Sequence, residues 1–463
     1  MTAEERQYKF KRKRRIRPNS AHIIVLGFLG VILLGAFLLC LPISAKSRNW
    51  MNFLDAIFTA TSAVCVTGLT VINVANTLSA FGQVILLLLI QIGGLGFMSL
   101  TTMFMLILRK KITLKNRLVI KEALNQNENH GLVRLTRNIL LVTFSIECIG
   151  FLLLLYPFVS ANGSYGVWQA LFTSVSAFCN AGFDIIGDCS LMGYADNVAV
   201  NLSVMLLIVL GGIGFTVIMD IGKNKGNFKK LALHSKIVLI TTFLLIITGG
   251  AFYFGTEYSN ASTLGDMRTG DKIMASFFQS ITTRTAGFAT LDQNALTPAA
   301  KFGTMILMFI GASPGSTGGG IKTTSLVVLL LITISGIRKH GDITIGKRKI
   351  NAHNARKAVS ICITGIAVVI GATLILLISE RGHAADATGL LQFDNVLFEC
   401  ISAFGTVGLS CGLTPFLSAT GKIIIMLVMF FGRVGIITIG LMLLQGNGTD
   451  DKIRYPDANL MVG

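Results

Sequence analysis

Four short segments of this chain hold the residues best suited to chemistry, because each places a Phe and a Gly ten residues apart around small and hydroxylated side chains. The segments are 58–68, 172–182, 277–287 and 398–408, and they align with one another without a gap. We call them the filter segments. The last five residues of each include no carboxylate, so a bound cation would be coordinated by backbone carbonyl oxygens. Rings of such carbonyls replace the hydration shell of a monovalent cation. The candidate ligands are Val64, Cys65, Val66, Thr67, Gly68, Phe178, Cys179, Asn180, Ala181, Gly182, Thr283, Arg284, Thr285, Ala286, Gly287, Phe404, Gly405, Thr406, Val407 and Gly408.

The closing glycine suits this role, because a carbonyl-lined loop needs backbone conformations that a Cβ hinders. A short helix that leads into such a loop also directs the negative end of its dipole at the ion. One Phe-x9-Gly pattern alone would be better explained as packing between short helices. Four copies at matching places favour a pore instead.

A second stretch, residues 309–324, lies between apolar blocks at 301–310 and 323–337. Both blocks are shorter than the roughly 20 residues that a helix needs to cross a bilayer. Non-helical backbone at that depth is tolerated where protein buries it or where it lines a watery cavity. Pro314 and five glycines make the stretch pliable, so we expect the intramembrane loop 311–322 to be a gate. The candidate gate residues are Gly311, Ser313, Pro314, Gly315, Ser316, Thr317, Gly318, Gly319, Gly320, Lys322 and Arg433.

Arg433 enters this set through an alignment that places it in register with Ala312. A cation at the bilayer centre costs at least about 2.5–3.5 kcal/mol unless it finds partners or a cavity. We expect Arg433 to face the pore and to bond loop carbonyls; the alternative is a structural ion pair with Glu399 or Asp184. Four stretches align in this register: 93–96, 211–214, 311–314 and 432–435. Only the third, 311–314, is expected to leave the helix.

Three other charged residues fall inside apolar or filter segments. Arg284 would repel a cation if it faced the axis, so we expect its side chain to point away toward an acid such as Asp292 or Glu399. Glu147 is a candidate proton or sodium site, with a satisfied interhelical hydrogen bond as the alternative. For Lys322 the alternative to a gate role is a side chain that extends to the membrane interface.

The elements that position these residues must lie in a membrane. The 463 residues are 52% hydrophobic and 13% charged, with a mean hydropathy of +0.70, against about 25% charged residues in soluble proteins. The net charge of +18 is confined to a few polar segments, so we expect no nucleic acid partner. The eight cysteines form no CxxC pair and the six histidines have no ligand spacing, so we expect no metal site beyond the transported cation.

A unit of span, re-entrant segment and span recurs four times. We therefore predict an all-α polytopic membrane protein of four helix–pore loop–helix repeats with pseudo-fourfold symmetry, containing eight spans and four re-entrant pore helices. The first spans are expected near 21–41, 138–159, 237–256 and 358–379, and the second near 84–108, 198–219, 301–337 and 423–444. The predicted parts are a basic N-terminus at 1–20, repeats at 21–121, 122–235, 236–350 and 351–444, and a tail at 445–463.

The basic residues orient this topology. Thirty of the forty Lys and Arg fall in 1–20, 109–137, 222–236, 338–357 and the tail. Because cytoplasmic loops carry the excess of Lys and Arg, both termini are expected in the cytoplasm and the re-entrant segments are expected to enter from outside. The basic segments 109–121 and 338–357 could dock a partner or anionic lipid.

The four filter segments, the third-repeat loop and the Phe-Gly-Arg-Val-Gly stretch at 431–435 resemble the Trk/Ktr/HKT superfamily of cation transporters. Within it, the chain is similar over nearly its whole length to the membrane subunits of bacterial Ktr potassium uptake systems. The resemblance implies a homodimer in the cell membrane with one pore per subunit, and potassium uptake aided by sodium. It also implies a cytosolic ring of nucleotide-binding regulatory subunits, so a nucleotide is expected only on that partner and no cofactor is expected in this chain.

Two other functions are weighed against this one. Residues 315–322 read Gly-x4-Gly-Ile-Lys, one residue too long for a phosphate loop and preceded by a helix rather than a strand. No HExxH or comparable catalytic set is present, so we do not expect an enzyme. A sodium-selective channel or cation symporter on the same scaffold stays open, because selectivity depends on filter geometry that residue types do not fix.

Overall fold

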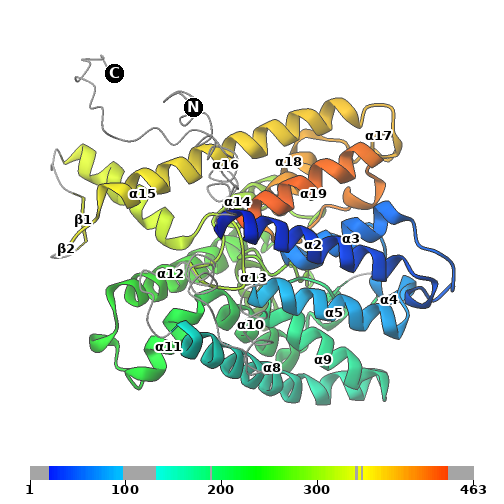
Figure 1. Cartoon of the computed structure of the whole chain (residues 1–463), viewed down its shortest axis with the longest axis horizontal. Helices are drawn as coiled ribbons and strands as arrows, with labels where there is room; N and C mark the ends of the chain where they lie inside the picture. The colour runs from blue at the N-terminus through cyan, green and yellow to red at the C-terminus, as the bar shows by residue number, and fades with distance from the viewer. Residues whose placement is uncertain (1–19, 97–131, 188–189, 339–342, 346–347, 436–463) are drawn as a thin grey trace, which may run out of the picture.

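The computed structural model describes residues 20–96, 132–187, 190–338, 343–345 and 348–435, and these residues are mostly helical (Figure 1). We refer to α2–α5, α8–α11, α12–α15 and α16–α19 as units 1 to 4. In chain order the elements are α2 (Ser20–Cys40), η1 (Pro42–Ser44), α3 (Phe53–Cys65), α4 (Val74–Thr77), α5 (Ala80–Leu95), α8 (Leu132–Asn162), α9 (Tyr165–Phe178), η2 (Met192–Tyr194), α10 (Val198–Ile213), α11 (Phe215–Lys223), η3 (Phe228–Lys230), α12 (Leu233–Glu257), α13 (Thr269–Thr282), α14 (Pro298–Phe309), α15 (Thr323–Ile337), β1 (Thr344–Ile345), β2 (Arg348–Lys349), α16 (Ala352–Ser379), α17 (Ala384–Ala387), α18 (Phe393–Gly405), η4 (Thr414–Phe416) and α19 (Ala419–Val434).

Each unit begins with a long apolar helix. Among the described residues, α2, α8, α12 and α16 are long and apolar enough to cross a membrane. Large apolar side chains such as Phe37 on α2 and Leu374 on α16 are more than half exposed. Outward-facing apolar side chains suit lipid rather than water. The expectation of several membrane-spanning helices near 21–41, 138–159, 237–256 and 358–379 is thus confirmed.

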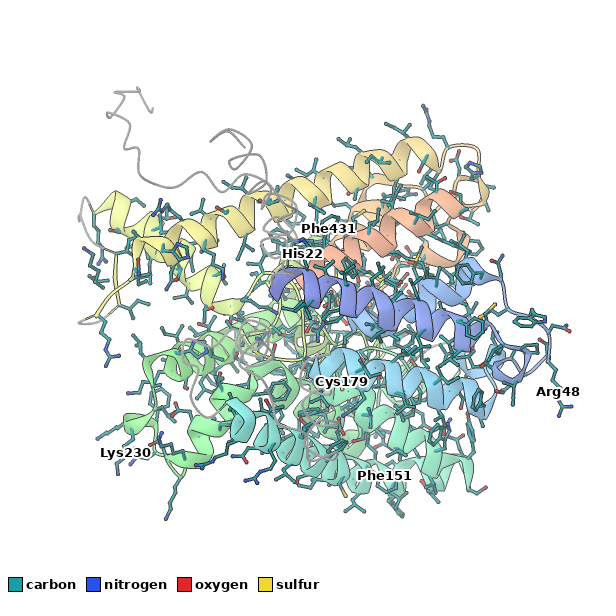
Figure 2. The ribbon with its side chains drawn as sticks, viewed as in Figure 1. His22, Arg48, Phe151, Cys179, Lys230 and Phe431 are labelled. Carbon is teal, nitrogen blue, oxygen red and sulfur yellow. The ribbon has the colours of Figure 1, made fainter. Side chains whose placement is uncertain are left out.

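A short helix follows each long one. The helices α3, α9, α13 and α18 have 13 or 14 residues, hence a length of about 20 Å, which falls short of a bilayer core of about 30 Å. They are buried by the other helices, and Figure 2 shows Cys179, just after α9, in the interior of the molecule. In the same view Arg48 and Lys230 lie at opposite ends.

We call α5, α10, α14 and α19, which come after the short helices, the third helices. They differ from one expectation drawn from the sequence. Only the 311–314 stretch was expected to leave the helix, but α10 ends at Ile213 and turns by 94° into α11. Gly214, at the turn, has φ 102°, a conformation that a side chain would strain. In the same register α5 ends before Gly96 (φ 79°) and α19 before Gly435 (φ 89°). The closing glycine, which the alignment already contained, was the signal for this break.

Each of these third helices begins in the same way. A polar N-cap side chain accepts a hydrogen bond from the backbone N–H three residues later, at 3.1 to 3.3 Å. Such caps satisfy N–H groups that the helix leaves free. The four caps are Ser79, Asn197, Thr297 and Ser418. In units 3 and 4 buried glutamates, Glu257 and Glu380, bind the cap residue in turn.

The units meet side by side, and the last one returns to the first. Helix α19 packs on α3 and α5 packs on α9, and Figure 1 shows α19 in orange next to α3 in blue. Units 2 and 3 meet where α10 packs on α13, and units 3 and 4 where α14 packs on α18. A two-stranded antiparallel hairpin, β1–β2, follows α15.

Several expectations fall on other residues. The N-terminus 1–19, residues 97–131 with most of the basic segment 109–137, the segments at 339–342 and 346–347 and the residues after 435 lie outside the described residues. The inner halves of the spans expected at 84–108 and 423–444 therefore remain predictions, as do the repeat boundaries and the count of eight spans.

Candidate functional site

The four filter segments share one backbone conformation. Two residues before each closing glycine stands a residue with left-handed φ: Val66 (57°), Asn180 (57°), Thr285 (73°) and Thr406 (51°). The glycines also have positive φ, between 68° and 93°; they are Gly68, Gly182, Gly287 and Gly408. Left-handed backbone in a β-branched residue such as Val66 is uncommon and costs on the order of 1–3 kcal/mol. Strain repeated at four equivalent places points to a functional constraint.

These four glycines form a closed ring. A Cβ built on Gly68 would lie 3.0 Å from the Cα of Gly182, and the same relation leads from Gly182 to Gly287, from Gly287 to Gly408 and from Gly408 back to Gly68, at 3.0 to 3.2 Å. Each such Cβ would also collide with the carbonyl oxygen before the next glycine. These oxygens belong to Ala181, Ala286, Val407 and Thr67. The ring therefore has room only for glycine, and it brings four carbonyls to one centre.

Hydroxyl groups at the ends of the short helices hold the tips in place. Ser62 accepts from the Gly68 N–H at 3.0 Å and Ser402 from the Gly408 N–H at 3.1 Å. In the second segment Ser176 donates to the Phe183 carbonyl at 2.6 Å. The bonds to Ser62 and Ser402 occupy the N–H groups of two ring glycines, and the bond from Ser176 holds the carbonyl of Phe183, the residue after Gly182.

The third segment is shorter than its gapless alignment indicated. A fully buried Phe stands near the middle of each short helix: it is Phe58, Phe172 or Phe398 in three units, but Phe278 rather than Phe277 in unit 3. Thr282, four residues after Phe278, donates to the Phe288 carbonyl at 2.6 Å and so takes the role of Ser176. The pairing of Phe277 with the other three is therefore wrong, because one residue is missing between helix and glycine in unit 3.

Arg284 is buried with its side chain directed toward α12, where it donates to the Thr242 hydroxyl at 3.4 Å. The expected pairing with Asp292 or Glu399 is not found among the described residues. Glu399 instead accepts from Ser410, Cys411 and Thr414. The Arg284 side chain is therefore held by α12 rather than by an acid.

The intramembrane loop lies directly against the filter. The Thr317 hydroxyl donates to the Phe178 carbonyl at 3.2 Å, and the Gly319 N–H donates to the Thr406 hydroxyl at 3.0 Å. A Cβ on Gly318 would collide with the Thr285 hydroxyl. The loop thus touches segments 2, 3 and 4 of the ring, with no space for side chains at Gly318 and Gly319.

The loop is also anchored to its neighbours. Its backbone binds the α10–α11 turn through Ser313 N to Gly212 O (3.1 Å), Thr317 N to Gly211 O (3.3 Å) and Phe215 N to Gly315 O (2.9 Å). Within the loop the Ser316 hydroxyl donates to the Ser313 carbonyl at 2.7 Å. Three more of the predicted gate residues pack around these contacts: Gly311 lies against the Gly319 carbonyl and Gly320, and Pro314 lies against Gly214.

Arg433 joins the loop to unit 1. Its guanidinium donates to the Thr317 carbonyl through one nitrogen, and through the other to the Gly93 carbonyl and, at 3.3 Å, to that of Gly94. Neither Glu399 nor Asp184, the alternative partners, binds it among the described residues. The backbone carbonyls of Gly93 and Gly94 were not anticipated, because no side-chain pattern marks them.

Lys322 folds back on the loop that it ends. Its Nζ donates to the Gly318 carbonyl at 2.7 Å and to the Gly319 carbonyl at 3.1 Å. The side chain does not extend to an interface. A phosphate loop needs backbone N–H groups and a free lysine aimed at the ligand. Here the Lys322 ammonium group instead donates its hydrogen bonds to carbonyls of its own loop.

Glu147 lies behind the second segment. It accepts from the Gln91 amide at 2.9 and 3.2 Å and contacts the Cys179 thiol. This is the satisfied interhelical hydrogen bond that was one of the two expectations. The described residues include no group of three or more His, Cys, Asp or Glu that could hold a metal ion.

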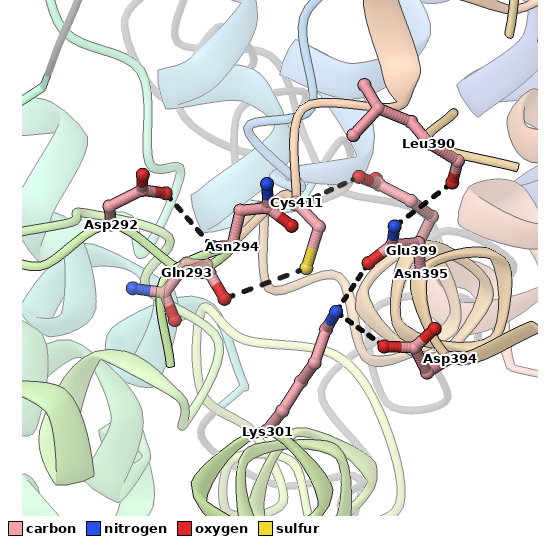
Figure 3. A network of polar contacts seen from close by, with 9 residues as sticks. All are labelled: Asp292, Gln293, Asn294, Lys301, Leu390, Asp394, Asn395, Glu399 and Cys411. Atoms are coloured by element: carbon pink, nitrogen blue, oxygen red, sulfur yellow. Dashed lines mark hydrogen bonds and ion pairs between the residues drawn. The ribbon is translucent and has the colours of Figure 1, made fainter. Parts of the chain in front are cut away.

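A cavity of about 420 Å³ opens on the side of the ring away from the loop. It is lined by Gly68 and Gly408, by Asp292 and Asn294 from unit 3 and by Ser410 and Gly412 from unit 4, among others. Figure 3 shows the seam beneath it, where Lys301 on α14 binds Asp394 at 2.7 Å and also Asn395 on α18. Asp292 is the one carboxylate among the lining residues, and one of its oxygens accepts from the Asn294 N–H at 2.9 Å.

Comparisons with known proteins agree with this arrangement. The family model "TrkH: Cation transport protein" matches residues 8–445. The chain is 40% identical over 450 residues to "Ktr system potassium uptake protein B" of Bacillus subtilis, covering 97% of this chain and 98% of that protein. It is 39% identical over 455 residues to "Potassium/sodium uptake protein NtpJ" of Enterococcus hirae, covering 98% and 99%.

The fold has a solved counterpart in the potassium transporter TrkH of Vibrio parahaemolyticus. The TM-score is 0.71 at 19% identity, over 94% of this chain and 86% of that one, so this likeness concerns the fold alone. The family match spans most of the chain, and two relatives at about 40% identity are covered almost completely. This chain belongs to the TrkH family of cation transport proteins.

Proposed function

We propose that this protein takes up potassium ions across a cell membrane through a pore within a single chain. The observation that carries the proposal is the closed ring of Gly68, Gly182, Gly287 and Gly408, with four carbonyls at its centre. The names of two relatives, a potassium uptake protein and a potassium/sodium uptake protein, support the choice of ion. The role is transport, not catalysis.

The ring acts as a filter through its backbone. Carbonyl oxygens replace the water of a monovalent cation, and their number and field strength set the selectivity. The helices α3, α9, α13 and α18 end at the ring, so their dipoles place partial negative charge there. The described part of the ring presents no carboxylate side chain, as suits a monovalent rather than a divalent cation.

The surrounding architecture consists of eight spans and four re-entrant helices with pseudo-fourfold symmetry. The repeated cap, the repeated left-handed tip and the repeated break at the closing glycine support it. Both termini are cytoplasmic and the re-entrant helices enter from outside. In support, Lys230, which belongs to the basic segment 222–236, lies at the opposite end of the molecule from Arg48, which follows α2 (Figure 2).

The loop 311–322 and Arg433 form the gate, and the arrangement described above is its closed state. Hydrogen bonds from Thr317 and Gly319 hold the loop against the filter. Arg433 adds a positive charge beside the ion path and ties the loop to unit 1. A cation is therefore opposed both by the loop itself and by the guanidinium.

The partners follow the relatives called Ktr system proteins. We expect a homodimer embedded in lipid, controlled by a cytosolic ring of nucleotide-binding subunits, with sodium aiding uptake. The nucleotide would lie on that partner and not on this chain. A second candidate, a sodium-selective channel or cation symporter on the same scaffold, is favoured by the name of the Enterococcus relative.

Ion flux into liposomes that hold the purified protein tests the proposal. Potassium and rubidium should enter faster than sodium, and shortening the loop between Ser313 and Gly319 should raise the flux of all three, with protein-free liposomes as the control. Faster sodium than potassium entry would favour the second candidate. If the flux does not change when the loop is shortened, the loop is not the gate.

A further inference from the structure

The side chains of Thr285 and Thr406 occupy equivalent places at the loop-facing end of the filter. Each stands two residues before its closing glycine, has left-handed φ and is fully buried. The equivalent residues of units 1 and 2 offer less to a cation. Val66 is apolar, and Asn180, with its amide oriented to satisfy its neighbours, directs its nitrogen at the carbonyls of Ala177 and Ile208.

Both hydroxyls meet consecutive residues of the intramembrane loop. Thr285 lies against Gly318, and Thr406 accepts from the Gly319 N–H at 3.0 Å. Because consecutive Cα atoms are about 3.8 Å apart, the two hydroxyls face the same small region. The Phe178 carbonyl reaches that region as well, since it accepts from Thr317.

The hydroxyl group of Thr285 is left unpaired in this arrangement. Its hydroxyl oxygen is buried without a hydrogen-bond partner among the described residues. Leaving a buried polar group unpaired costs about 1–3 kcal/mol. Thr406 is spared that cost only because the loop supplies a donor. When the loop withdraws, two hydroxyl oxygens and one carbonyl are left without partners at the inner end of the filter.

We infer that Thr285 and Thr406 form a side-chain binding site for a monovalent alkali cation at the inner end of the filter, for which the gate loop competes. In the closed state the Gly319 N–H and the Thr317 hydroxyl occupy the oxygens of Thr406 and Phe178. A cation at the site takes over these oxygens and that of Thr285. Neutral oxygens without a carboxylate suit a monovalent ion.

Competition for the same oxygens makes the coupling reciprocal. A cation that binds only when the loop is withdrawn shifts the loop toward the withdrawn state by its binding free energy. Potassium should therefore loosen the loop in the wild-type protein even without transport. This inference rests on the proposed filter and gate.

Hydrogen–deuterium exchange of the peptide covering 310–324 measures the effect in lipid nanodiscs. Wild-type protein should exchange faster as potassium replaces N-methylglucamine. Thr285→Val should leave the exchange without potassium unchanged and raise the half-effective potassium concentration at least fivefold, and Thr285→Ser should restore it. Thr406→Val, which loses the loop bond, should exchange fast even without potassium.

Thr290→Val is the matched control, because Thr290 is also buried with an unpaired hydroxyl but follows Gly287 on the other side of the ring. It should keep the wild-type potassium response. If Thr285→Val fails to fold, Thr285→Ala is measured in its place. A Thr285 variant with the wild-type response overturns the inference, while the flux and loop-shortening results still stand. If potassium does not enter faster than sodium and the flux does not change when the loop is shortened, the proposed function is contradicted, whatever the Thr285 variants show.

Discussion

Lys422 and Asp55 form an ion pair, with Nζ 2.7 Å from Oδ1, although 367 positions separate them in the chain. The pair joins α19 to α3 at the seam where the last unit meets the first. No peptide link closes the ring at this seam, whereas every other pair of neighbouring units is consecutive in sequence. A comparable contact at the seam between units 3 and 4 joins Lys301 to Asp394.

Breaking the closing pair should weaken the ring. Lys422→Met leaves the Asp55 carboxylate, whose side chain is 23% exposed, without its cation. We expect a loss of on the order of 1 kcal/mol, above the usual worth of an exposed pair because both groups are largely covered. Thermal unfolding in detergent measures it.

Lys229→Met, in the exposed η3 turn, is the control and should leave the melting temperature unchanged. The swapped double variant, Lys422→Asp with Asp55→Lys, should recover part of the loss. A Lys422→Met protein as stable as the control would show that the seam is held by apolar packing alone.

A second prediction concerns the ring glycines. Gly287→Ala should abolish potassium uptake, because the new Cβ collides with the Val407 carbonyl and because φ 77° is strained for alanine. Gly371→Ala, on α16 with open space around it, should keep at least half of the wild-type uptake. Rubidium tracer uptake by both variants, normalised to the amount of protein in the membrane, measures the difference. Equal uptake would contradict a close-packed glycine ring.

Arg433 offers a test of the gate. Arg433→Gln removes the charge beside the proposed ion path and the forked contact to Thr317 and Gly93, so basal cation flux into liposomes should rise severalfold. Arg433→Lys keeps the positive charge but loses the forked hydrogen bonds, so its basal flux should lie between that of the wild-type protein and that of Arg433→Gln. Arg381→Gln, on an exposed turn, is the control. A fall in flux with intact folding would mean that Arg433 supports conduction rather than closure.

The long helices were predictable because their signal is local. Twenty apolar residues in a row have few alternatives to a membrane helix, and the first span expected at 21–41 corresponds to α2 at Ser20–Cys40. The loop after α14 was also predictable, since Pro314 and its glycines cannot continue a helix. The broken α10–α11 turn was missed because Gly211, Gly212 and Gly214 are individually tolerated in membrane helices.

Contacts between distant segments were harder to foresee. Phe277 was aligned in place of Phe278 because the two phenylalanines are adjacent and the sequence does not show which of them faces the core. The Arg433 partners are backbone carbonyls, which every residue possesses, so no residue type marks Thr317 or Gly93. The acid expected beside Arg284 was inferred from charge alone, but Thr242 on α12 is the group that it meets.

The cavity beside the glycine ring carries a charged group that a cation would meet. Asp292 is the one carboxylate among the residues that line it, next to Gly68 and Gly408 of the ring. A unit charge about 6 Å from a cation in water is worth about 0.7 kcal/mol, which raises the local concentration about threefold. Asp292→Asn should therefore raise the KM for potassium two- to threefold at low ionic strength, with little change in maximal rate. Because salt screens such charges over about 10 Å at 0.1 M, the difference should shrink as ionic strength rises. Asp266→Asn, an exposed carboxylate not among the cavity-lining residues, should leave the KM unchanged. An Asp292→Asn effect that persists at high salt would mean that the carboxylate shapes the mouth of the pore rather than attracting the ion.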